Sequence, residues 1–300
     1  MIIVITGPTG VGKTKLSIML AKKYNAEIIN GDSVQIYKGL DIGSSKIKED
    51  EKEGIVHHLL DYKEVSEDYS LYEYQKDARK LIEDITKRGK NVIIVGGTGL
   101  YIKSVLYDYQ LESENNFNND NYEGVSTEAL YQELIKLDKD IIIDKYNRRR
   151  VIRALDYYKN NHKSINLNNN GNKLIYDNVV FIGLTIDRDI LYKMIDDRVD
   201  KMLADGLINE VKGFYDKNIR SRVLLGAIGY KELYQYFDGV ITCDKAIELI
   251  KRNSRRYAKR QYTFMRNQFD IKWFNVNIDD FSKTVSDVCE YIDNEMQIIK

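Results

Sequence analysis

The sequence predicts an α/β fold, in which a parallel sheet covered by helices on both faces carries a mainly helical insertion. Apolar, β-branched runs alternate with amphipathic helical segments along most of the 300 residues. A glycine-rich loop, GPTGVGKT, joins the first such run to the first helical segment. Between about residues 111 and 177 the alternation gives way to helical patterns without a clear strand. We therefore expect a core formed by residues 1–110 and 178–300, interrupted by an insertion domain at 111–177.

Each element of the first half has its own signal. The run at 2–6 is rich in isoleucine, and Leu16, Leu20 and Ala21 recur at helical spacing in the segment after the glycine loop. Ser70 and Glu73 have the spacing of a capping box and so mark the start of a later helix. The expected elements are strands at 2–6, 26–31 and 91–97 and helices at 13–23, 70–89 and 98–109.

The second half resumes the sheet and then becomes mostly helical. NVVFIGLTI (178–186) is an apolar, β-branched run typical of a buried strand. Asparagine-rich stretches at 115–121 and 166–172 are typical of solvated loops. We expect helices at 188–204, 207–217, 230–237, 244–267 and 281–297 and a last strand at 271–276.

Composition narrows the class of protein. Basic and acidic residues number 46 each, so attraction to nucleic acid has to come from local clusters and not from net charge. The two cysteines, Cys243 and Cys289, are too few for a disulfide framework and lack the companions of a zinc site. No apolar run approaches the roughly 20 residues that span a bilayer. We expect a cytoplasmic protein that does not engage membranes.

The loop GPTGVGKT fits the phosphate-binding pattern G-x-x-x-x-G-K-[ST]. Its glycines let backbone N–H groups point inward, and the helix that begins near Lys13 directs its positive end at the same spot. Lys13 would bind phosphate oxygens and the Thr14 hydroxyl would ligate Mg²⁺. Kinases, nucleotide-hydrolysing motors and other transferases share this loop, so it predicts a P-loop NTPase-like core but no particular reaction. The loop consists of Gly7, Pro8, Thr9, Gly10, Val11, Gly12, Lys13 and Thr14.

Asp32 follows the second expected strand, at the edge where α/β sheets bind their ligands. Its carboxylate could ligate a metal or act as a general base toward a substrate nucleophile. It could equally cap the next turn through its own backbone. The residues alone leave these three roles open.

Two basic runs stand out in a chain of zero net charge. Residues 145–153 hold five basic side chains and residues 251–266 hold seven, and neither stretch contains an acid. A single run of this kind is usually a solvated helix face. Two such runs with aromatic residues interleaved favour binding to a phosphate backbone.

Eight motifs resemble, in their order, those of tRNA dimethylallyltransferases. They extend from residue 7 to about 274 and are GPTGVGKT, NGDSVQIYKGLDIGSSK, HHLLD, YSLYEYQKDA, VGGTGLY, RRVIRALD, AIGYKEL and RRYAKRQYTFMR. The resemblance implies transfer of a dimethylallyl group from dimethylallyl diphosphate to N6 of the adenosine 3′ to the anticodon, with Mg²⁺ as cofactor. It also implies that the insertion helps to grip the anticodon stem-loop of the tRNA. We expect the enzyme to act as a monomer.

The resemblance also assigns roles to individual residues. Lys13 and Thr14 would anchor the diphosphate and the metal, and Asp32 would be the general base on the adenine amino group. Thr98 would lie near the leaving oxygen, so Lys13, Asp32 and Thr98 are the expected catalytic residues. The expected tRNA contacts are Asp32, Ser33, Val34, Gln35, Thr98, Arg149, Arg150, Val151, Ile152, Arg153, Arg256, Arg260 and Gln261.

At one position the chain departs from the family pattern. Some members have an arginine that helps to hold the diphosphate immediately before the A-[IV]-G-Y motif, where this chain has Gly226. Arg220 or Arg222 would be a substitute. Two other functions stay open: an adenylate isopentenyltransferase would share the loop and Asp32, and a small-molecule kinase would use the loop for ATP.

Overall fold

The computed structural model describes residues 1–109, 111, 122–165 and 172–298. Its centre is one six-stranded parallel sheet with the strand order β3-β2-β4-β1-β5-β6. The loops after β1, β2 and β4 therefore leave the sheet at one edge, from three adjacent strands. The strands are β1 (Ile2–Thr6), β2 (Ala26–Asn30), β3 (His57–His58), β4 (Asn91–Val95), β5 (Val179–Thr185) and β6 (Lys272–Asn275).

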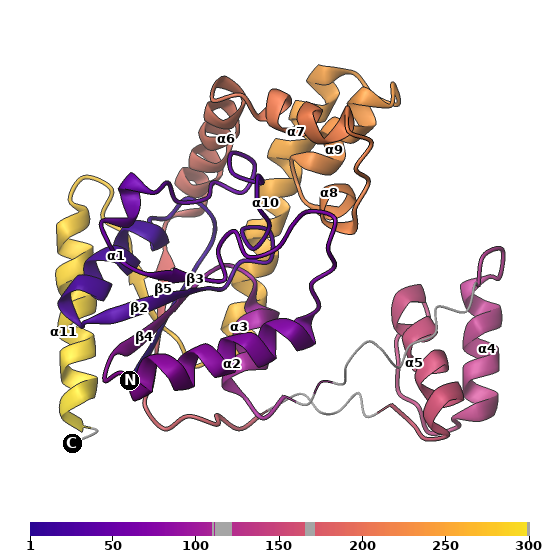
Figure 1. Ribbon diagram of the computed structural model, residues 1–300, viewed down its shortest axis with the longest axis horizontal. Helices are drawn as coiled ribbons and strands as arrows, with labels where there is room; N and C mark the ends of the chain where they lie inside the picture. The colour runs from indigo at the N-terminus through magenta and orange to yellow at the C-terminus, as the bar shows by residue number, and fades with distance from the viewer. Residues whose placement is uncertain (110, 112–121, 166–171, 299–300) are drawn as a thin grey trace.

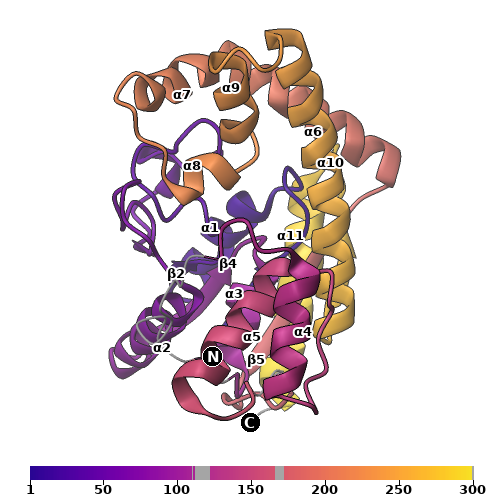
Figure 2. The ribbon, with the colours of Figure 1, turned by 90° about the vertical axis from the view of Figure 1, so that its right-hand side faces the viewer.

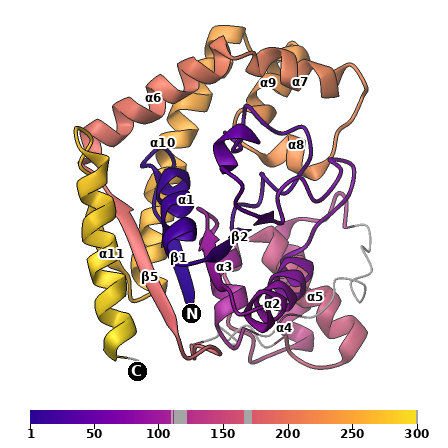
Figure 3. The same cartoon turned by 60° about the vertical axis from the view of Figure 1, so that its left-hand side comes forward.

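Both faces of the sheet are buried, which is why its central strands are continuous apolar runs. Along β1, Ile2 and Val4 belong to one hydrophobic core, and Ile3 and Ile5 belong to the other. One face is covered by α1 (Lys13–Lys23) and α11 (Phe281–Ile298) (Figures 1 and 3). The other face is covered by α2 (Leu71–Lys87) and α3 (Gly99–Leu106).

A helical cap follows β5 and packs on the long helix α10 (Cys243–Gln268). In Figure 3 the cap lies over one end of the sheet, and the long loop after β2 runs beside it. α10 continues from the cap past α3 to the sheet, so it joins the two parts of the molecule. The helices of the cap are α6 (Arg188–Ala204), α7 (Leu207–Tyr215), α8 (Arg222–Gly226) and α9 (Tyr230–Phe237).

α4 (Thr127–Leu137) and α5 (Arg148–Asn161) form a small unit that stands beside the core (Figures 1 and 2). The two helices share a hydrophobic cluster of their own, separate from the two cores of the sheet. Tyr107 pairs antiparallel with Leu174 where the chain leaves the core and where it returns. This unit occupies the region in which we expect the insertion domain.

The predicted sheet and its helices are confirmed, with small shifts of their ends. The last strand forms as β6, and the capping box of Ser70 and Glu73 is present at the start of α2. The helix expected at 98–109 ends earlier, at Leu106. β3 and α8 are too short to show a hydrophobic periodicity, so the sequence does not predict them. The loop expected at 115–121 and most of that at 166–172 lie outside the described residues.

Among the residues described, no helix combines the length and the apolar character of a membrane span.

Gly96 allows β2 and β4 to end in close contact. A Cβ atom on Gly96 would lie 2.2 Å from the carbonyl group of Gly31, which is backbone and cannot rotate away. We expect Gly96→Ala to lower the free energy of unfolding by about 1–3 kcal/mol, measured by urea denaturation. Gly213→Ala in α7 is the matched control, because nothing lies within 4 Å of its Cβ position. It should stabilise the protein by about 0.5–1 kcal/mol, and equal effects of the two substitutions would contradict the steric argument.

Glu27 of β2 is a buried carboxylate that an arginine, a lysine and a histidine surround. Its oxygens accept from Arg88 at 2.7 Å and from Lys90 at 2.9 Å, and His58 Nε2 lies 2.7 Å away. Arg88 above all holds the pKa of Glu27 well below its usual range, against the opposing effect of burial. The lowered pKa stabilises the fold above pH ~4.3, the value of a free glutamate, and this contribution is lost as the pH falls further.

Glu27→Gln should therefore reduce the free energy of unfolding by about 1–3 kcal/mol at pH 7. The difference from the wild type should shrink between about pH 5 and pH 3, which denaturant titrations at several pH values would measure. Glu83→Gln is the matched control, because Glu83 pairs with Lys87 on the exposed surface of α2. A difference for Glu27→Gln that did not change with pH would rule out the carboxylate as its source.

Candidate active site

Three loops that carry predicted site residues meet at the carboxyl edge of the sheet. The glycine loop follows β1, Asp32 follows β2, and Thr98 follows β4. Backbone hydrogen bonds join the last two, because Thr98 N donates to Gly31 O at 3.1 Å and Gly31 N donates to Val95 O at 2.8 Å. These residues lie up to 91 positions apart in the sequence, and the order of three adjacent strands brings them together.

The glycine loop has the backbone that its sequence predicts. Gly7, Gly10 and Gly12 all have positive φ, and Gly12 forms the N-cap of α1 in the left-handed region. The ammonium group of Lys13 donates to the carbonyl oxygens of Gly7 at 3.0 Å and Pro8 at 2.6 Å. Lys13 therefore spans its own loop at the N-terminus of the helix, where an anion would be bound.

Lys13 has an unusual electrostatic environment. Burial, and after it the positive charge of Arg198, lowers the pKa of Lys13 to about 7, while Asp32 opposes this effect. An anion in the loop would add negative charge beside this ammonium group and so favour its charged form.

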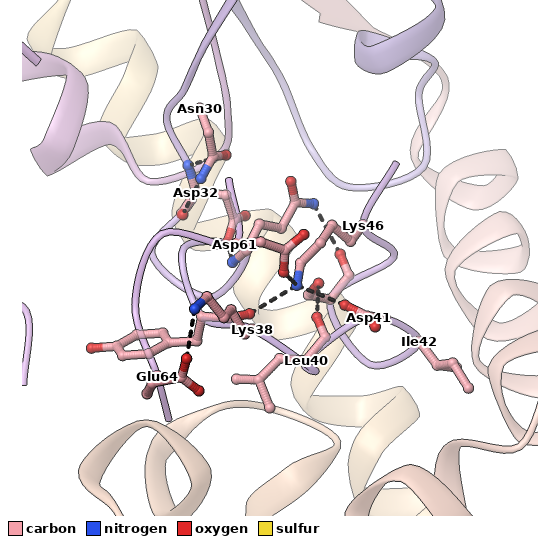
Figure 4. A network of polar contacts seen from close by, with 12 residues as sticks. Asn30, Asp32, Lys38, Leu40, Asp41, Ile42, Lys46, Asp61 and Glu64 are labelled. Atoms are coloured by element: carbon pink, nitrogen blue, oxygen red, sulfur yellow. Dashed lines mark hydrogen bonds and ion pairs between the residues drawn. The ribbon is translucent and has the colours of Figure 1, made fainter. Parts of the chain in front are cut away.

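Asp32 is held by its backbone and by one of its two carboxylate oxygens. Asn30 accepts from Asp32 N and donates to Asp32 O, each at 3.0 Å (Figure 4). Asp32 Oδ1 accepts from Val34 N at 2.9 Å and from Gln35 N at 3.4 Å. In the part of the chain that the structure describes, Oδ2 has no hydrogen-bond partner. The capping role considered for Asp32 is therefore real, and it occupies only one of the two oxygens.

Thr98 is linked to Asp32 through Ser33. The Thr98 hydroxyl accepts from Ser33 N at 3.1 Å and lies 3.3 Å from the Ser33 hydroxyl. On its other side the hydroxyl of Tyr257, from α10, approaches the side chains of Thr98 and Gln261. Burial, and after it the charge of Asp32, raises the pKa of Tyr257 to about 12, so this phenol stays protonated. Tyr257 thus belongs to the site and is a further hydrogen-bonding group that the sequence does not single out.

A buried lysine holds the long loop that follows Asp32. Lys46 donates to Asp41 at 2.7 Å, to Asp61 at 2.5 Å and to the Tyr37 carbonyl at 2.8 Å (Figure 4). Its side chain is 3% exposed, whereas the two aspartates reach solvent. Gln35, one of the predicted tRNA contacts, donates to Ser44 O at 3.1 Å. Lys46 therefore stabilises the frame on which the Asp32–Gln35 turn rests.

A cleft of about 3070 Å³ lies between this edge and the insertion. Its lining combines the glycine loop, the Asp32–Gln35 turn, the middle of α10 and the start of α5. The insertion contributes Arg149, Arg150, Ile152 and Arg153. Val151 is buried in the cluster between α4 and α5, and so the arginines are the charged surface of this range. Arg148 instead donates to the carbonyl groups of Val125 and Tyr122.

Fewer basic side chains of α10 are available to bind phosphates than the sequence predicts. Lys251 pairs with Asp200 at 2.6 Å and Arg255 pairs with Asp196, both acids coming from α6. The guanidinium of Arg266 stacks on Tyr262 and Trp273. The exposed basic residues of α10 that form no ion pair in the described part of the chain are Arg256, Lys259, Arg260 and the stacked Arg266. Of the predicted contacts on this helix, Arg256 and Arg260 are exposed, and Gln261 is buried with its amide donating to Gly97 O at 3.0 Å.

The family described as IPP transferase matches residues 35–268. The chain belongs to the IPP transferase family. It is 51% identical to a tRNA dimethylallyltransferase of Anoxybacillus flavithermus, with 98% of this chain and 96% of the relative covered. A tRNA dimethylallyltransferase of Bacillus subtilis is 49% identical, with 92% and 90% covered.

Solved structures of the family share the fold. A full-length tRNA isopentenylpyrophosphate transferase from Bacillus halodurans matches with a TM-score of 0.77 and 42% identity, over 99% of this chain and 96% of that chain. A eukaryotic dimethylallyltransferase acting on tRNA matches with a TM-score of 0.87 and 30% identity, over 100% and 80%.

Gly226 stands where some members of the IPP transferase family have an arginine, so the basic side chains around it are the possible replacements for that charge. Gly226 lines the cleft with open space around it, and the position itself supplies no charge. Arg220 forms a bidentate ion pair with Asp238 and stacks on Tyr215, so it is engaged elsewhere. Arg222 lines the cleft. Arg198 of α6 also lines it and is the cation whose charge acts on Lys13.

Arg198 and Ser45, which contact each other, were not foreseen from the sequence. Arg198 stands in RDILYKMIDDRVDK, where acids on either side make it resemble a solvated residue. Its position in the cleft follows from the packing of α6, and the local sequence gives no signal of it. Ser45 lies in a loop where serine is unremarkable in type, so only the fold brings it to the site.

The donor set of the site fits Mg²⁺ held largely by a substrate. The Thr14 side chain is exposed to the cleft at the start of α1. Ser17 donates to the Thr14 carbonyl, and among the described residues the Thr14 hydroxyl has no hydrogen-bond partner. Within the described residues there is no group of three or more histidine, cysteine or acidic side chains placed to hold a metal. Mg²⁺ commonly binds through one or two protein oxygens together with phosphates and water, which suits a site with a single hydroxyl.

Proposed function

We propose that this protein transfers a dimethylallyl group from dimethylallyl diphosphate to N6 of the adenosine 3′ to the anticodon of a tRNA, and releases diphosphate. One observation carries the proposal. A phosphate-binding loop, a carboxylate oxygen without a partner and two exposed arginine surfaces all border one cleft, shared by the core and the insertion. The names of the relatives and their near full-length identity support it.

Asp32 and Lys13 divide the chemistry between them. The N6 amine of adenine is a poor nucleophile, because its lone pair is delocalised into the ring, and it needs an acceptor for its proton as the N6–C1 bond forms. Asp32 Oδ2 is available for that proton, while Oδ1 keeps the turn in place. As the C1–O bond breaks, its electron pair goes to the diphosphate oxygen. Lys13 and the N–H groups of the loop stabilise the resulting charge.

Thr14 is the protein group that would hold Mg²⁺ beside the diphosphate. When bound, the metal supplies positive charge that stabilises the leaving diphosphate. Lys13, one residue earlier, supports the same oxygens and is oriented by α1. Thr98, whose hydroxyl is bonded to Ser33, would place a donor on the same side of the cleft as Asp32.

The cleft suits an RNA substrate better than a mononucleotide. To reach Asp32, an adenine has to leave the base stack of the anticodon loop. Arg149 and Arg150 on α5 and Arg260 on α10 line the cleft, and Arg256 is exposed one turn before Arg260, so these side chains can bind phosphates on both sides of the extruded base. An AMP molecule would not reach both surfaces. Because one chain builds the whole cleft, we propose that the enzyme acts as a monomer.

Mass spectrometry of an anticodon stem-loop tests the proposal. After incubation with dimethylallyl diphosphate and Mg²⁺, the RNA should gain one dimethylallyl group in exchange for one proton, and inorganic diphosphate should appear. The same RNA with guanosine at the target position is the control and should not change. Prenylation of AMP as efficient as that of the stem-loop would replace this function with that of an adenylate isopentenyltransferase. Release of ADP from ATP with a small-molecule acceptor would indicate a kinase.

A further inference from the structure

The diphosphate site needs a second fixed cation, and Gly226 does not provide it. Lys13 is the only basic side chain of the glycine loop itself. A fully ionised leaving diphosphate carries more negative charge than one Mg²⁺ and one ammonium group together offset, and planar guanidinium groups bind such oxygens in pairs. The arginines that the cap contributes to the cleft are Arg198 and Arg222, and the nearby Arg220 is paired with Asp238.

Arg198 meets the requirement by position. It lines the cleft together with the glycine loop and Asp32. No carboxylate forms an ion pair with Arg198 in the described ranges of the chain. Burial lowers the pKa of Arg198, and the charge of Asp32 opposes this. A partly buried cation without a paired acid is costly to keep, unless an anion is its normal partner.

Ser45 holds Arg198 by one nitrogen. Arg198 Nε donates to the Ser45 hydroxyl at 2.8 Å, which leaves the two terminal nitrogens of the guanidinium free of hydrogen bonds among the described residues. Those two nitrogens form the fork that binds a pair of phosphate oxygens. Tethering Nε fixes the plane of the fork and so lowers the entropy lost when an anion binds.

The backbone of Ser45 is shaped for this contact. Its φ is 49°, in the left-handed region that serine seldom adopts. The neighbouring Ser44 carbonyl accepts from Gln35, and Lys46 is buried in its ion pairs, so the residues on both sides of Ser45 are fixed. Strained residues whose neighbours hold them in place are concentrated at active sites and ligand-binding positions.

We propose that Arg198 is a second diphosphate-binding residue and that Ser45 is its positioning residue. The inference rests on the proposed function. As the C1–O bond breaks, its electron pair passes to the diphosphate oxygen, and Arg198 and Lys13 offset the added charge from two sides. The N6 proton goes to Asp32 as before. Because Gln35 and Arg198 both bind the Ser44–Ser45 segment, the RNA-facing turn and the diphosphate site share one support.

Calorimetric titration with inorganic diphosphate and Mg²⁺ tests the inference without need of turnover. Arg198→Gln should weaken diphosphate binding by roughly 10-fold to 100-fold and lower kcat by roughly 100-fold. The Kd for the stem-loop should change little. Guanidinium ion should restore part of the activity of Arg198→Ala. Arg188→Gln, on the exposed start of the same helix, is the matched control and should leave all three quantities unchanged.

Two substitutions of Ser45 separate its hydroxyl from its backbone. Ser45→Ala removes the hydroxyl and keeps the Cβ atom at positive φ, whereas Ser45→Gly removes the hydroxyl and relieves that strain. Both should weaken diphosphate binding by a few-fold to about 10-fold, and only Ser45→Gly should raise the melting temperature.

The outcomes distinguish this inference from the proposed function. If the wild type prenylates the stem-loop and binds diphosphate, but Arg198→Gln binds it equally well, the inference is wrong and the function stands. Ser45 variants with unchanged diphosphate affinity would remove its positioning role, and they decide the point even if Arg198→Gln fails to fold. A wild type that neither binds diphosphate nor prenylates RNA would overturn the proposed function itself.

Discussion

Asp32→Asn is expected to lower the single-turnover rate of prenyl transfer by roughly 10²-fold to 10⁴-fold, the usual contribution of a general base. Asparagine keeps an oxygen for the N–H groups of Val34 and Gln35, so the turn should persist. It replaces the other oxygen with an NH₂ group, which cannot take the N6 proton. Rapid-quench measurement of the prenylated stem-loop gives the rate, and fluorescence anisotropy gives its Kd.

The Kd for RNA is the measurement that decides between catalysis and recognition. We expect it to change by less than about 3-fold in Asp32→Asn, because the arginine surfaces carry most of the phosphate contacts. Asp50→Asn is the matched control, since Asp50 is exposed in the short helix η1 (Asp50–Lys52) and does not line the cleft. A loss of RNA binding equal to the loss of rate would make Asp32 a recognition residue.

Lys13→Met should have the second largest effect. Methionine keeps much of the length of the side chain but removes the charge from the loop. We expect kcat to fall by roughly 10²-fold to 10³-fold, and the affinity for inorganic diphosphate to fall with it. The melting temperature should not fall, because burial lowers the pKa of Lys13 and its charge therefore costs stability in the unliganded fold.

Lys15→Met controls for the charge of the whole segment. Lys15 is exposed and lies over the ring of Phe281 of α11, 5.0 Å from its centre, so it belongs to the surface of the helix. Its replacement should leave both kcat and diphosphate affinity near the wild-type values. Similar losses in the two variants would mean that the general positive charge of α1 matters, and not the placement of Lys13.

The parts of the site that the sequence predicts are those attached to strand ends. Gly7, Asp32 and Thr98 each follow an apolar run that can only be a buried strand, and parallel strands bring their carboxyl ends together. Once the strands are recognised, the convergence of the three residues needs no further information. Their chemical roles follow from residue type and from the family resemblance.

Arg198 escapes prediction because tertiary packing determines its neighbours. Its helix has acids and bases on several sides, and no periodicity tells which of them turns to the cleft. The prediction for the basic run on α10 is incomplete for a related reason. It contains no acid of its own, yet Asp196 and Asp200 neutralise part of it from α6, more than 50 residues away in the sequence. Charge patterns read along one helix cannot account for partners contributed by another.

The pairing of Tyr107 with Leu174 has a consequence for how such an enzyme can be assembled. Tyr107 is where the chain leaves the core and Leu174 is where it returns, and the two residues are neighbours in space. The fold of the core therefore does not depend on the 66 residues between them. None of the six strands lies between these points. A module placed there can lengthen, shorten or change its surface with no effect on strand order. If the proposed function holds, the RNA-binding unit is thus a replaceable attachment, and the choice of nucleic acid can evolve separately from the chemistry.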